Sequence, residues 1–375
     1  MIPELSVSRR TRSTPFTSRV EAAGVKGYTV YNHTLLATKF RSIEADYWHL
    51  CENVQVWDVS CEKQVAISGP DAYRLIQLMT PRDLSKARIG RCFYVPLCNT
   101  EGGIVNDPIA IKLTENDWWL SIADTDVMLW AQGLATGFNL DVTVTEPDVW
   151  PLAVQGPKAE DLMARVFGES VRDIKFFNIT PMSYQGVDMQ VARSGWSKQG
   201  GFEIYVNDAT LAGPLWDELF EKGQDLNVGP GCPNLIERVE SGLLSLGNDM
   251  GYDTTPLECG LDQYVDLDAD IDSLSLPALR KLPPKRQLMG LVIHQSCTVS
   301  ESNVYVDGQV VGEITSQAYS PKYGVHLAFA LCSLDALESN LTLDVNTNLG
   351  TLQGQLTTLP FNFGSLGLTP TTPAK

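Results

Sequence analysis

The stretch VQGPKAEDLMARVFG, residues 154–168, predicts a strand that turns at Gly-Pro into an amphipathic helix. A second stretch, ISGPDAYRLIQLM at 67–79, repeats this order of strand, Gly-Pro and helix. Proline is tolerated at the first position of a helix because that N–H has no intrahelical acceptor, so we expect each proline to begin its helix. The two stretches indicate either a duplicated structural unit or two unrelated strand-to-helix turns, and the sequence leaves both open.

Strands and helices mix irregularly on either side of these stretches. The apolar residues of 215–220 and of 235–246 recur at helical spacing. Pro233 before the second run and Gly247 after it suit the two ends of a helix. A doubly wound sheet needs regular βαβ spacing, which is absent, so the sequence predicts the α+β class. The predicted strands are 64–69, 107–113, 118–124, 152–156, 187–195, 202–206 and 286–294.

The C-terminal part of the chain has a different pattern. Asp307-Gly308 separates two alternating runs within 303–314, which is the strongest short-range signal for a β-hairpin. Residues 268–284 contain three prolines and are typical of a connection. Because only strand patterns follow, we predict a separate all-β domain of about 90 residues.

The composition excludes several classes of protein. Of 375 residues, 43% are hydrophobic and 19% are charged, which indicates a globular chain of two or three domains. A formal net charge of −17 argues against nucleic acid as the partner, since a phosphate backbone requires a basic face. The longest apolar stretches fall far short of the roughly 20 residues that a membrane span needs. We therefore expect a cytoplasmic protein without nucleic-acid or membrane partners; its oligomeric state is open, with a homodimer as one option.

Common catalytic and metal-binding motifs are absent. The eight cysteines include no CxxC pair and the four histidines no i, i+4 pair, so we expect buried thiols in a reducing compartment. The aspartates of DLDADID (266–272) alternate as in a calcium loop. However, a loop starting at Asp268 has Ser273 where glycine is required and Leu279 where glutamate is required. The sequence therefore predicts no bound metal.

Longer motifs are more informative. Six segments, in the family's own order, resemble the glycine-cleavage T-protein (aminomethyltransferase) family: GGIVNDPIAI (102–111), LAVQGPKA (152–159), ARSGWSKQGGFEIYV (192–206), IERVESGLLSLGNDM (236–250), TPLECGL (255–261) and GEITSQAYSPKYGVHLA (312–328). Three more segments resemble one branch of that family, the dimethylsulfoniopropionate demethylases: residues 12–33, residues 46–65, and MTPRDLS at 79–85.

The resemblance implies a three-domain cloverleaf with tetrahydrofolate bound in its central cavity. The domains expected from it are a discontinuous folate-binding domain (1–50 plus 146–275), an α+β domain (51–145) and a C-terminal β-barrel-like domain (276–375).

The same resemblance implies roles for individual residues. Asp107 matches the family's catalytic-site aspartate, and Glu203 matches the carboxylate that hydrogen-bonds the pterin. Tyr205 resembles the aromatic residue beside that carboxylate. Arg238 matches an arginine near the folate, and Tyr94 lies where the family has a cavity-lining tyrosine.

The segment FEIYV (202–206) gives the pterin carboxylate a physical basis. Glu203 and Tyr205 alternate with apolar residues, so we expect them on one face of a strand. The pattern alone allows that face to be either the solvent side or the lining of a cavity. In a cavity, a carboxylate accepts two parallel N–H bonds, which the amino-pyrimidinone edge of a pterin offers.

The other candidate residues have structural alternatives as well. Asp107 before Pro108 is a common turn former, yet its carboxylate can also stabilise a sulfonium cation or the positive charge that develops on the folate nitrogen. Trp196 either caps the core or, with Tyr94, binds a dimethylsulfonium group by cation–π attraction worth roughly 0.5–2 kcal/mol. Arg238 either pairs with Glu237 or Glu240 on the surface, or binds the anionic side of the folate.

The reaction that the resemblance implies is methyl transfer from dimethylsulfoniopropionate, a small sulfonium substrate, to N5 of tetrahydrofolate. The products are 3-methylthiopropionate and 5-methyltetrahydrofolate. One alternative is the glycine-cleavage aminomethyltransferase, although residues 195–198 are Gly-Trp-Ser-Lys where T-proteins have Gly-Tyr-Thr-Gly, and Ala123 replaces an asparagine. Another is a non-enzymatic folate-binding protein of iron–sulfur assembly, whose Lys-Gly-Cys-Tyr segment is missing here.

Overall fold

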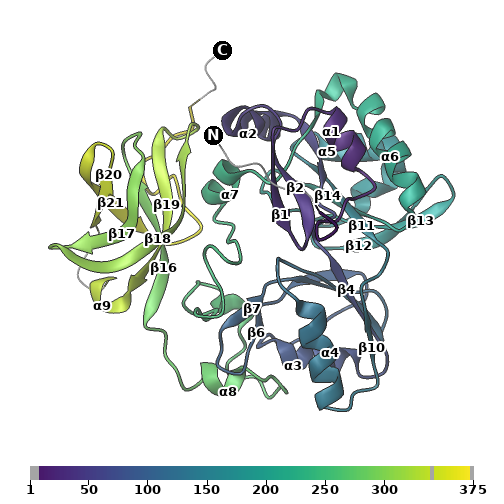
Figure 1. The fold of residues 1–375 in the computed structure, drawn as a ribbon, viewed down its shortest axis with the longest axis horizontal. Coiled ribbons are helices and arrows are strands. Elements are labelled where there is room, and N and C mark those ends of the chain that lie inside the picture. The colour runs from purple at the N-terminus through teal and green to yellow at the C-terminus, as the bar shows by residue number, and fades with distance from the viewer. Residues whose placement is uncertain (1–7, 338–341, 372–375) are drawn as a thin grey trace. The chain divides into compact units, whose positions relative to one another are not determined.

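The computed structural model describes residues 8–337 and 342–371 of the chain (Figure 1). The chain divides into two compact units, each built from several segments, and each contains helices together with β-sheet. This confirms the predicted α+β class. Unit 1 consists of residues 1–72, 87–93 and 108–234, and unit 2 of residues 73–86, 94–107 and 235–375.

A six-stranded sheet forms the centre of unit 1. Its strands lie in the order β12-β13-β14-β11-β3-β15, and only β3 and β15 are parallel neighbours. Helices α5 and α6 pack against this sheet, and Leu162, Leu215 and Phe202 belong to the resulting core. The elements are β3 (Val54–Asp58), β11 (Trp150–Gln155), α5 (Ala159–Phe167), β12 (Ile179–Tyr184), β13 (Val187–Ala192), β14 (Gly201–Val206), α6 (Ala209–Lys222) and β15 (Val228–Pro230).

A second sheet in unit 1 has five strands, in the order β10-β4-β9-β8-β5. A hairpin of β1 and β2 and two helices precede both sheets in the chain. The elements are α1 (Thr17–Ala22), β1 (Gly27–Tyr31), β2 (Thr34–Lys39), α2 (Ile43–Glu52), β4 (Gln64–Ser68), β5 (Arg91–Tyr94), β8 (Ile109–Lys112), β9 (Asp117–Ser121), α4 (Val127–Gly137) and β10 (Thr143–Thr145).

The two Gly-Pro stretches form the strand-to-helix turns that the sequence predicts, but the prolines do not begin the helices. Helix α5 starts two residues after its proline, as does α3 (Ala72–Met79). The turn is tight because each glycine approaches backbone: a Cβ would lie 2.4 Å from the Asp141 oxygen at Gly69 and 2.3 Å from the Asn53 oxygen at Gly156. Both glycines have positive φ, so the proline belongs to the turn rather than to the first helical residue.

Strand pairing favours a duplicated unit over two unrelated turns. In the first copy β4 pairs with β9, and β9 with β8; in the second β11 pairs with β14, and β14 with β13. In each copy a helix follows the first strand and another helix follows the last of these strands. The weak sequence echo therefore corresponds to a repeated connectivity.

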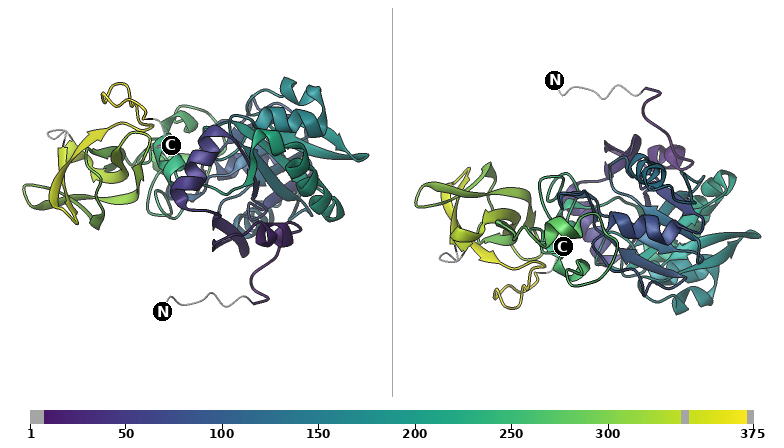
Figure 2. Two further views of the ribbon diagram at one scale, coloured as in Figure 1. Left: turned by 90° about the horizontal axis from the view of Figure 1, so that it is seen from above. Right: turned by 90° about the horizontal axis from the view of Figure 1, so that it is seen from below.

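Unit 2 contains a closed barrel in the order β16-β19-β18-β17-β20-β21, seen from two further directions in Figure 2. The predicted hairpin is confirmed, since Asp307 and Gly308 have φ of 48° and 75° between β17 and β18. A short helix, α9, interrupts the C-terminal part, so the expectation of strands alone is wrong there. The barrel region comprises β16 (Arg286–Ile293), β17 (Val299–Val306), β18 (Gln309–Ser320), β19 (Val325–Ser333), α9 (Leu334–Leu337), β20 (Thr342–Thr347) and β21 (Gly350–Thr357).

The remaining elements of unit 2 are short. Strands β6 (Leu97–Cys98) and β7 (Ile104–Asn106) form a two-stranded ladder, and α8 (Leu276–Leu279) lies within the predicted connection. Helix α7 (Leu235–Ser241) ends earlier than its apolar spacing predicts. Its stop is Gly242, which has φ of 69° and allows the Leu243 N–H to bond the Arg238 carbonyl.

None of the eight cysteines forms a disulfide, and all eight lie in the described part of the chain. Six are buried as expected, whereas Cys51 and Cys297 are partly exposed. Within residues 8–337 and 342–371, no helix combines the length and apolarity needed to cross a bilayer.

Candidate active site

Strand β14 presents two different faces, as its alternating sequence predicts. Phe202, Ile204 and Val206 join the large core of unit 1, whereas Glu203 and Tyr205 point to the other side of the sheet. That side is not solvent, because Glu203 is 8% exposed and Tyr205 is 2% exposed. The solvent-face alternative is therefore wrong for both residues.

The cross-strand neighbours of Glu203 have small side chains. Its cross-strand partners are Ala153 on β11 and Ala192 on β13. The Ser194 hydroxyl donates a hydrogen bond to one carboxylate oxygen. Burial raises the pKa of Glu203, and the bond from Ser194 lowers it in part. Ser194 is the hydrogen-bond donor that the described residues supply to this side chain, so acceptor positions remain for the N–H groups of a ligand.

Tyr205 belongs to a small apolar cluster on the same side. Its ring lies 5.8 Å from the ring of Trp119, and Cys92 and Ile179 are members of the cluster. Burial raises the pKa of the Tyr205 hydroxyl and raises that of the Cys92 thiol to about 12. Both groups are therefore neutral at physiological pH, so this cluster forms an uncharged surface.

Phe177, which packs against this cluster, is a further candidate that the sequence does not predict. It has φ of 59°, a left-handed conformation that is rare for a bulky side chain. Such strain tends to persist at functional sites. No sequence motif signals it, because the strain depends on backbone bonds from Cys92 to Phe177 and from Phe177 to Arg193.

Trp196 lies in the loop that joins β13 to β14, and its side chain is half-buried. The loop begins at Ser194 and returns through Gly200 and Gly201, which have φ of 83° and 157°. Half-burial is compatible both with capping the core and with binding a ligand, so the role of Trp196 stays a prediction.

In unit 2 the structure brings together two of the predicted residues, Asp107 and Tyr94. The Tyr94 hydroxyl donates a hydrogen bond of 3.2 Å to Oδ2 of Asp107. Burial raises the pKa of Asp107 to about 7, although the bond from Tyr94 lowers it in part. The carboxyl group consequently titrates near neutral pH, which is frequent among catalytic groups and uncommon elsewhere.

The glycine pair before Asp107 has a steric reason. A Cβ at Gly103 would lie 2.1 Å from the Tyr252 carbonyl oxygen, and one at Gly102 would lie 2.8 Å from the Leu279 side chain. Gly102 also has φ of 89°. The GGIVNDP motif thus combines a turn that only glycine fits with the aspartate that follows β7.

Two further residues surround the Tyr94–Asp107 pair. The Tyr264 ring lies 4.7 Å from the ring of Tyr94. The Arg82 guanidinium lies 5.1 Å from the Tyr264 ring and donates a hydrogen bond to the Tyr94 carbonyl. Burial lowers the pKa of Arg82, yet an arginine remains charged. Neither residue is among the candidates predicted from the sequence, although Arg82 belongs to the MTPRDLS segment at 79–85.

Arg238 is buried, so the predicted surface position of this arginine is wrong. The guanidinium is buried and forms an ion pair of 2.8 Å with Asp249. It also donates a 2.6 Å hydrogen bond to the Ser316 hydroxyl on β18 of the barrel. This network connects α7 to the barrel, and a contact of Arg238 with folate stays a prediction.

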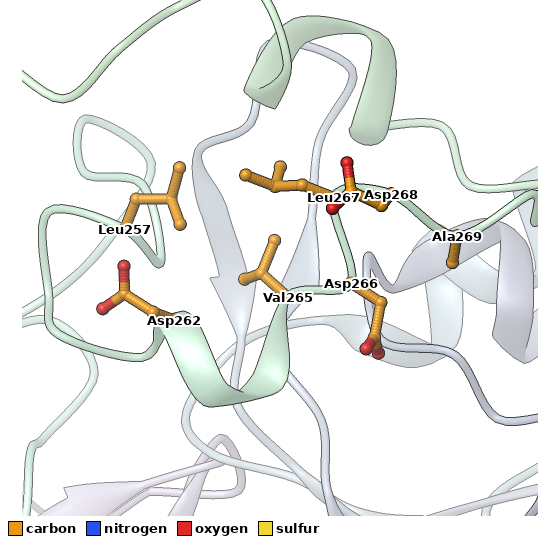
Figure 3. A pocket seen from close by; sticks show the side chains of 7 residues that line it. All are labelled: Leu257, Asp262, Val265, Asp266, Leu267, Asp268 and Ala269. Carbon is orange, nitrogen blue, oxygen red and sulfur yellow. The ribbon is translucent and has the colours of Figure 1, made fainter.

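The aspartate-rich run 266–272 borders a cavity of about 370 Å³ in unit 2 (Figure 3). Asp262, Asp266 and Asp268 line it together with apolar side chains. Asp266 accepts a 2.7 Å hydrogen bond from the Asp83 backbone and so holds that loop. Nowhere in the described ranges do three acidic, histidine or cysteine side chains gather as metal ligands would.

With this geometry established, comparison with known proteins identifies the family. A model of the GCVT N-terminal domain matches residues 16–269, and a model of the glycine cleavage T-protein C-terminal barrel domain matches residues 286–362. The chain therefore belongs to the glycine cleavage T-protein family, as the motifs predict.

Individual relatives refine this result. Dimethylsulfoniopropionate demethylase DmdA of Ruegeria pomeroyi is 52% identical over 343 residues, which cover 91% of this chain and 94% of that protein. An aminomethyltransferase of Moorella thermoacetica is 26% identical over 359 residues, covering 93% and 97%. The solved aminomethyltransferase T of Bartonella henselae has a TM-score of 0.83 at 23% identity, covering 94% and 98%, and so shares the fold. The borders predicted for the three domains stay a prediction.

Proposed function

We propose that the protein is a tetrahydrofolate-dependent methyltransferase that demethylates dimethylsulfoniopropionate to 3-methylthiopropionate. The observation that carries this conclusion is the 52% identity to the Ruegeria pomeroyi demethylase across nearly the whole chain. The aminomethyltransferase from Moorella thermoacetica, aligned over a similar length, reaches only 26%.

The donor set of unit 1 fits a reduced pterin. Glu203 is a buried carboxylate between two alanines, with acceptor positions beyond the one that Ser194 occupies. These positions suit the paired N–H groups of the amino-pyrimidinone ring. Tyr205 and its neutral apolar cluster provide a wall for the ring system. When bound, tetrahydrofolate supplies the N5 lone pair that accepts the methyl group.

Asp107 stabilises positive charge in this proposal. The sulfonium substrate is a cation, and its positive charge would pass with the methyl group to the folate nitrogen, which then releases its proton to solvent. A fixed carboxylate in a poorly solvated site lowers the energy of both charged species more than water would. Tyr94 orients the carboxylate through its 3.2 Å hydrogen bond and favours the ionised form. No covalent nucleophile is needed, since the leaving group departs as a neutral thioether.

Tyr94 of unit 2 and Trp196 of unit 1 are each a candidate for cation–π contact with the dimethylsulfonium group, and one such contact contributes roughly 0.5–2 kcal/mol. The substrate also carries a carboxylate, for which we assign Arg82 as the partner. Its guanidinium is a permanent cation beside Tyr94 and Tyr264, and its planar fork matches a carboxylate.

The reaction is tested by incubating the purified protein with tetrahydrofolate and dimethylsulfoniopropionate and analysing the folates by mass spectrometry. We expect 5-methyltetrahydrofolate and 3-methylthiopropionate in equal amounts without any carrier protein. A parallel reaction with an aminomethyl-lipoyl carrier protein tests the alternative activity. Formation of methylenetetrahydrofolate and ammonia there, with no methyl transfer from the sulfonium, would refute the proposal.

A further inference from the structure

Gln155, the last residue of β11, is fully buried and bonds to the loop that carries Trp196. Its Nε2 donates a 3.0 Å hydrogen bond to the Ser194 carbonyl. Its Oε1 accepts a 2.8 Å hydrogen bond from the Ser197 hydroxyl. One amide group therefore connects the residues on both sides of the Gly195-Trp196 step.

The loop has glycines at the two positions that lie against the Gln155 side chain. A Cβ at Gly195 would lie 1.9 Å from the Gln155 Nε2, and one at Gly201 would lie 2.5 Å from it. Both glycines have positive φ, of 144° and 157°. Contact and conformation thus both require glycine at the two points where the loop approaches this amide.

The amide is linked to the groups that the proposed reaction uses. The same Ser194 whose carbonyl accepts from Gln155 donates its hydroxyl to Glu203. Trp196 lies between Gly195 and Ser197, which both contact the Gln155 side chain. Displacement of this amide would alter the donor to the Glu203 carboxylate and the orientation of the tryptophan together.

We propose that Gln155 is a positioning residue for the methyl transfer: it fixes the loop 194–201 so that Ser194 orients Glu203 for the pterin and Trp196 keeps its place for the sulfonium substrate. Gln155 itself does not contact either reactant. The inference rests on the proposed function, which gives Glu203 and Trp196 their ligands.

A matched control separates positioning from stability. Gln55 lies directly opposite Gln155 on β3 and is also buried, at 1% exposure. Its amide bonds to the Asp46 carbonyl and the Trp57 indole rather than to the loop. The variants Gln155→Leu and Gln55→Leu therefore remove equivalent buried amides, and only the first removes bonds to the loop.

The experiment measures the thermal midpoint, the Kd for tetrahydrofolate by calorimetry and the KM for dimethylsulfoniopropionate. We expect both variants to lower the midpoint, and Gln155→Leu alone to weaken folate binding and raise the KM, each by about tenfold, the effect of one buried hydrogen bond. Equal effects of both variants, or unchanged Kd and KM in Gln155→Leu, would overturn the inference.

Should Gln155→Leu fail to fold, Ser197→Ala provides the second measurement. This change removes the bond to the Gln155 Oε1 and a longer bond of 3.3 Å that the Ser197 hydroxyl accepts from the Gln199 N–H, both in a partly exposed loop. We expect a KM about threefold higher at a nearly unchanged thermal midpoint, since each hydrogen bond is worth about 1 kcal/mol or less at such a position. An unaltered KM counts against positioning. If the wild-type protein shows no folate-dependent demethylation, the proposed function itself is refuted. If the wild-type protein is active and the variants have wild-type Kd and KM values, only the role of Gln155 is refuted.

Discussion

Replacement of Tyr94 by phenylalanine tests how Asp107 is controlled. The aromatic ring proposed to bind the sulfonium remains, and only the hydroxyl that donates a 3.2 Å hydrogen bond to Asp107 is lost. That bond favours the ionised carboxylate, whose pKa is about 7 because burial opposes ionisation. Tyr94→Phe should therefore raise the pKa of Asp107 and move the pH profile of turnover upward.

The size of the shift follows from the bond. A hydrogen bond to a charged group contributes about 1.5 kcal/mol at the lower end of its range, which suits a length of 3.2 Å. One pKa unit corresponds to about 1.4 kcal/mol, so the profile should move by about one unit. At pH 7 the ionised fraction of Asp107 then falls from about one half to about one tenth, which predicts a fivefold loss of turnover.

The assay is the formation of 5-methyltetrahydrofolate between pH 5.5 and about 9, at saturating substrate, for wild type and variant. Activity should rise with pH through about 7 in wild type, because the proposed mechanism requires the ionised carboxylate, whose pKa is about 7. Tyr94→Phe should recover nearly full turnover at the alkaline end. Tyr264→Phe is the matched control, since it leaves the bond to Asp107 in place. If the pH profile of turnover in Tyr94→Phe is unchanged, or moves to lower pH, this account of Asp107 is refuted.

Three further outcomes follow from the same geometry. Asp107→Asn should abolish most turnover yet raise the thermal midpoint at pH 8. The pKa of Asp107 in the folded protein is about 7, above the ordinary 3.8, so the folded protein loses stability as pH rises from about 4 to 7. Asparagine does not ionise and therefore removes that loss. Differential scanning calorimetry at pH 3.5 should show no such gain. Glu203→Gln should weaken tetrahydrofolate binding about 100-fold in calorimetry, because the amide presents N–H groups to a donor edge; binding within twofold of wild type would contradict the pterin assignment. Arg82→Ala should raise the KM for dimethylsulfoniopropionate by at least tenfold or so with little effect on folate affinity; the control Arg74→Ala removes a surface arginine near Asp272 and should change neither constant.

The sequence predicts local features of this protein well and long-range ones poorly. The turn at Asp307-Gly308 and the two faces of FEIYV depend on neighbouring residues, and both are confirmed. The alternation of polar and apolar residues in FEIYV does not predict that Glu203 is buried. Residues 202–206 of β14 are all buried, because the sheet is covered on both faces.

Partners that lie far apart in the sequence explain the remaining errors. Arg238 pairs with Asp249 and reaches Ser316 on the barrel, whereas the helical spacing of the sequence offers only its neighbours on α7. Tyr264 contacts Tyr94, although the two residues are 170 positions apart in the chain. No periodicity encodes such pairs, and the resemblance to a family supplied candidate residues without their contacts.

The two proposed functional carboxylates, one in each unit, have similar surroundings. Glu203 and Asp107 are each desolvated, and each accepts a hydrogen bond from one hydroxyl, of Ser194 and Tyr94 respectively. Desolvation raises both pKa values, so each group holds a proton more readily than an exposed acid. Ligands that bring N–H donors or positive charge favour the ionised forms. Binding of the sulfonium should therefore release protons from Asp107, and this reactant should bind more tightly as pH rises through about 7. Binding of tetrahydrofolate should likewise favour the ionised form of Glu203.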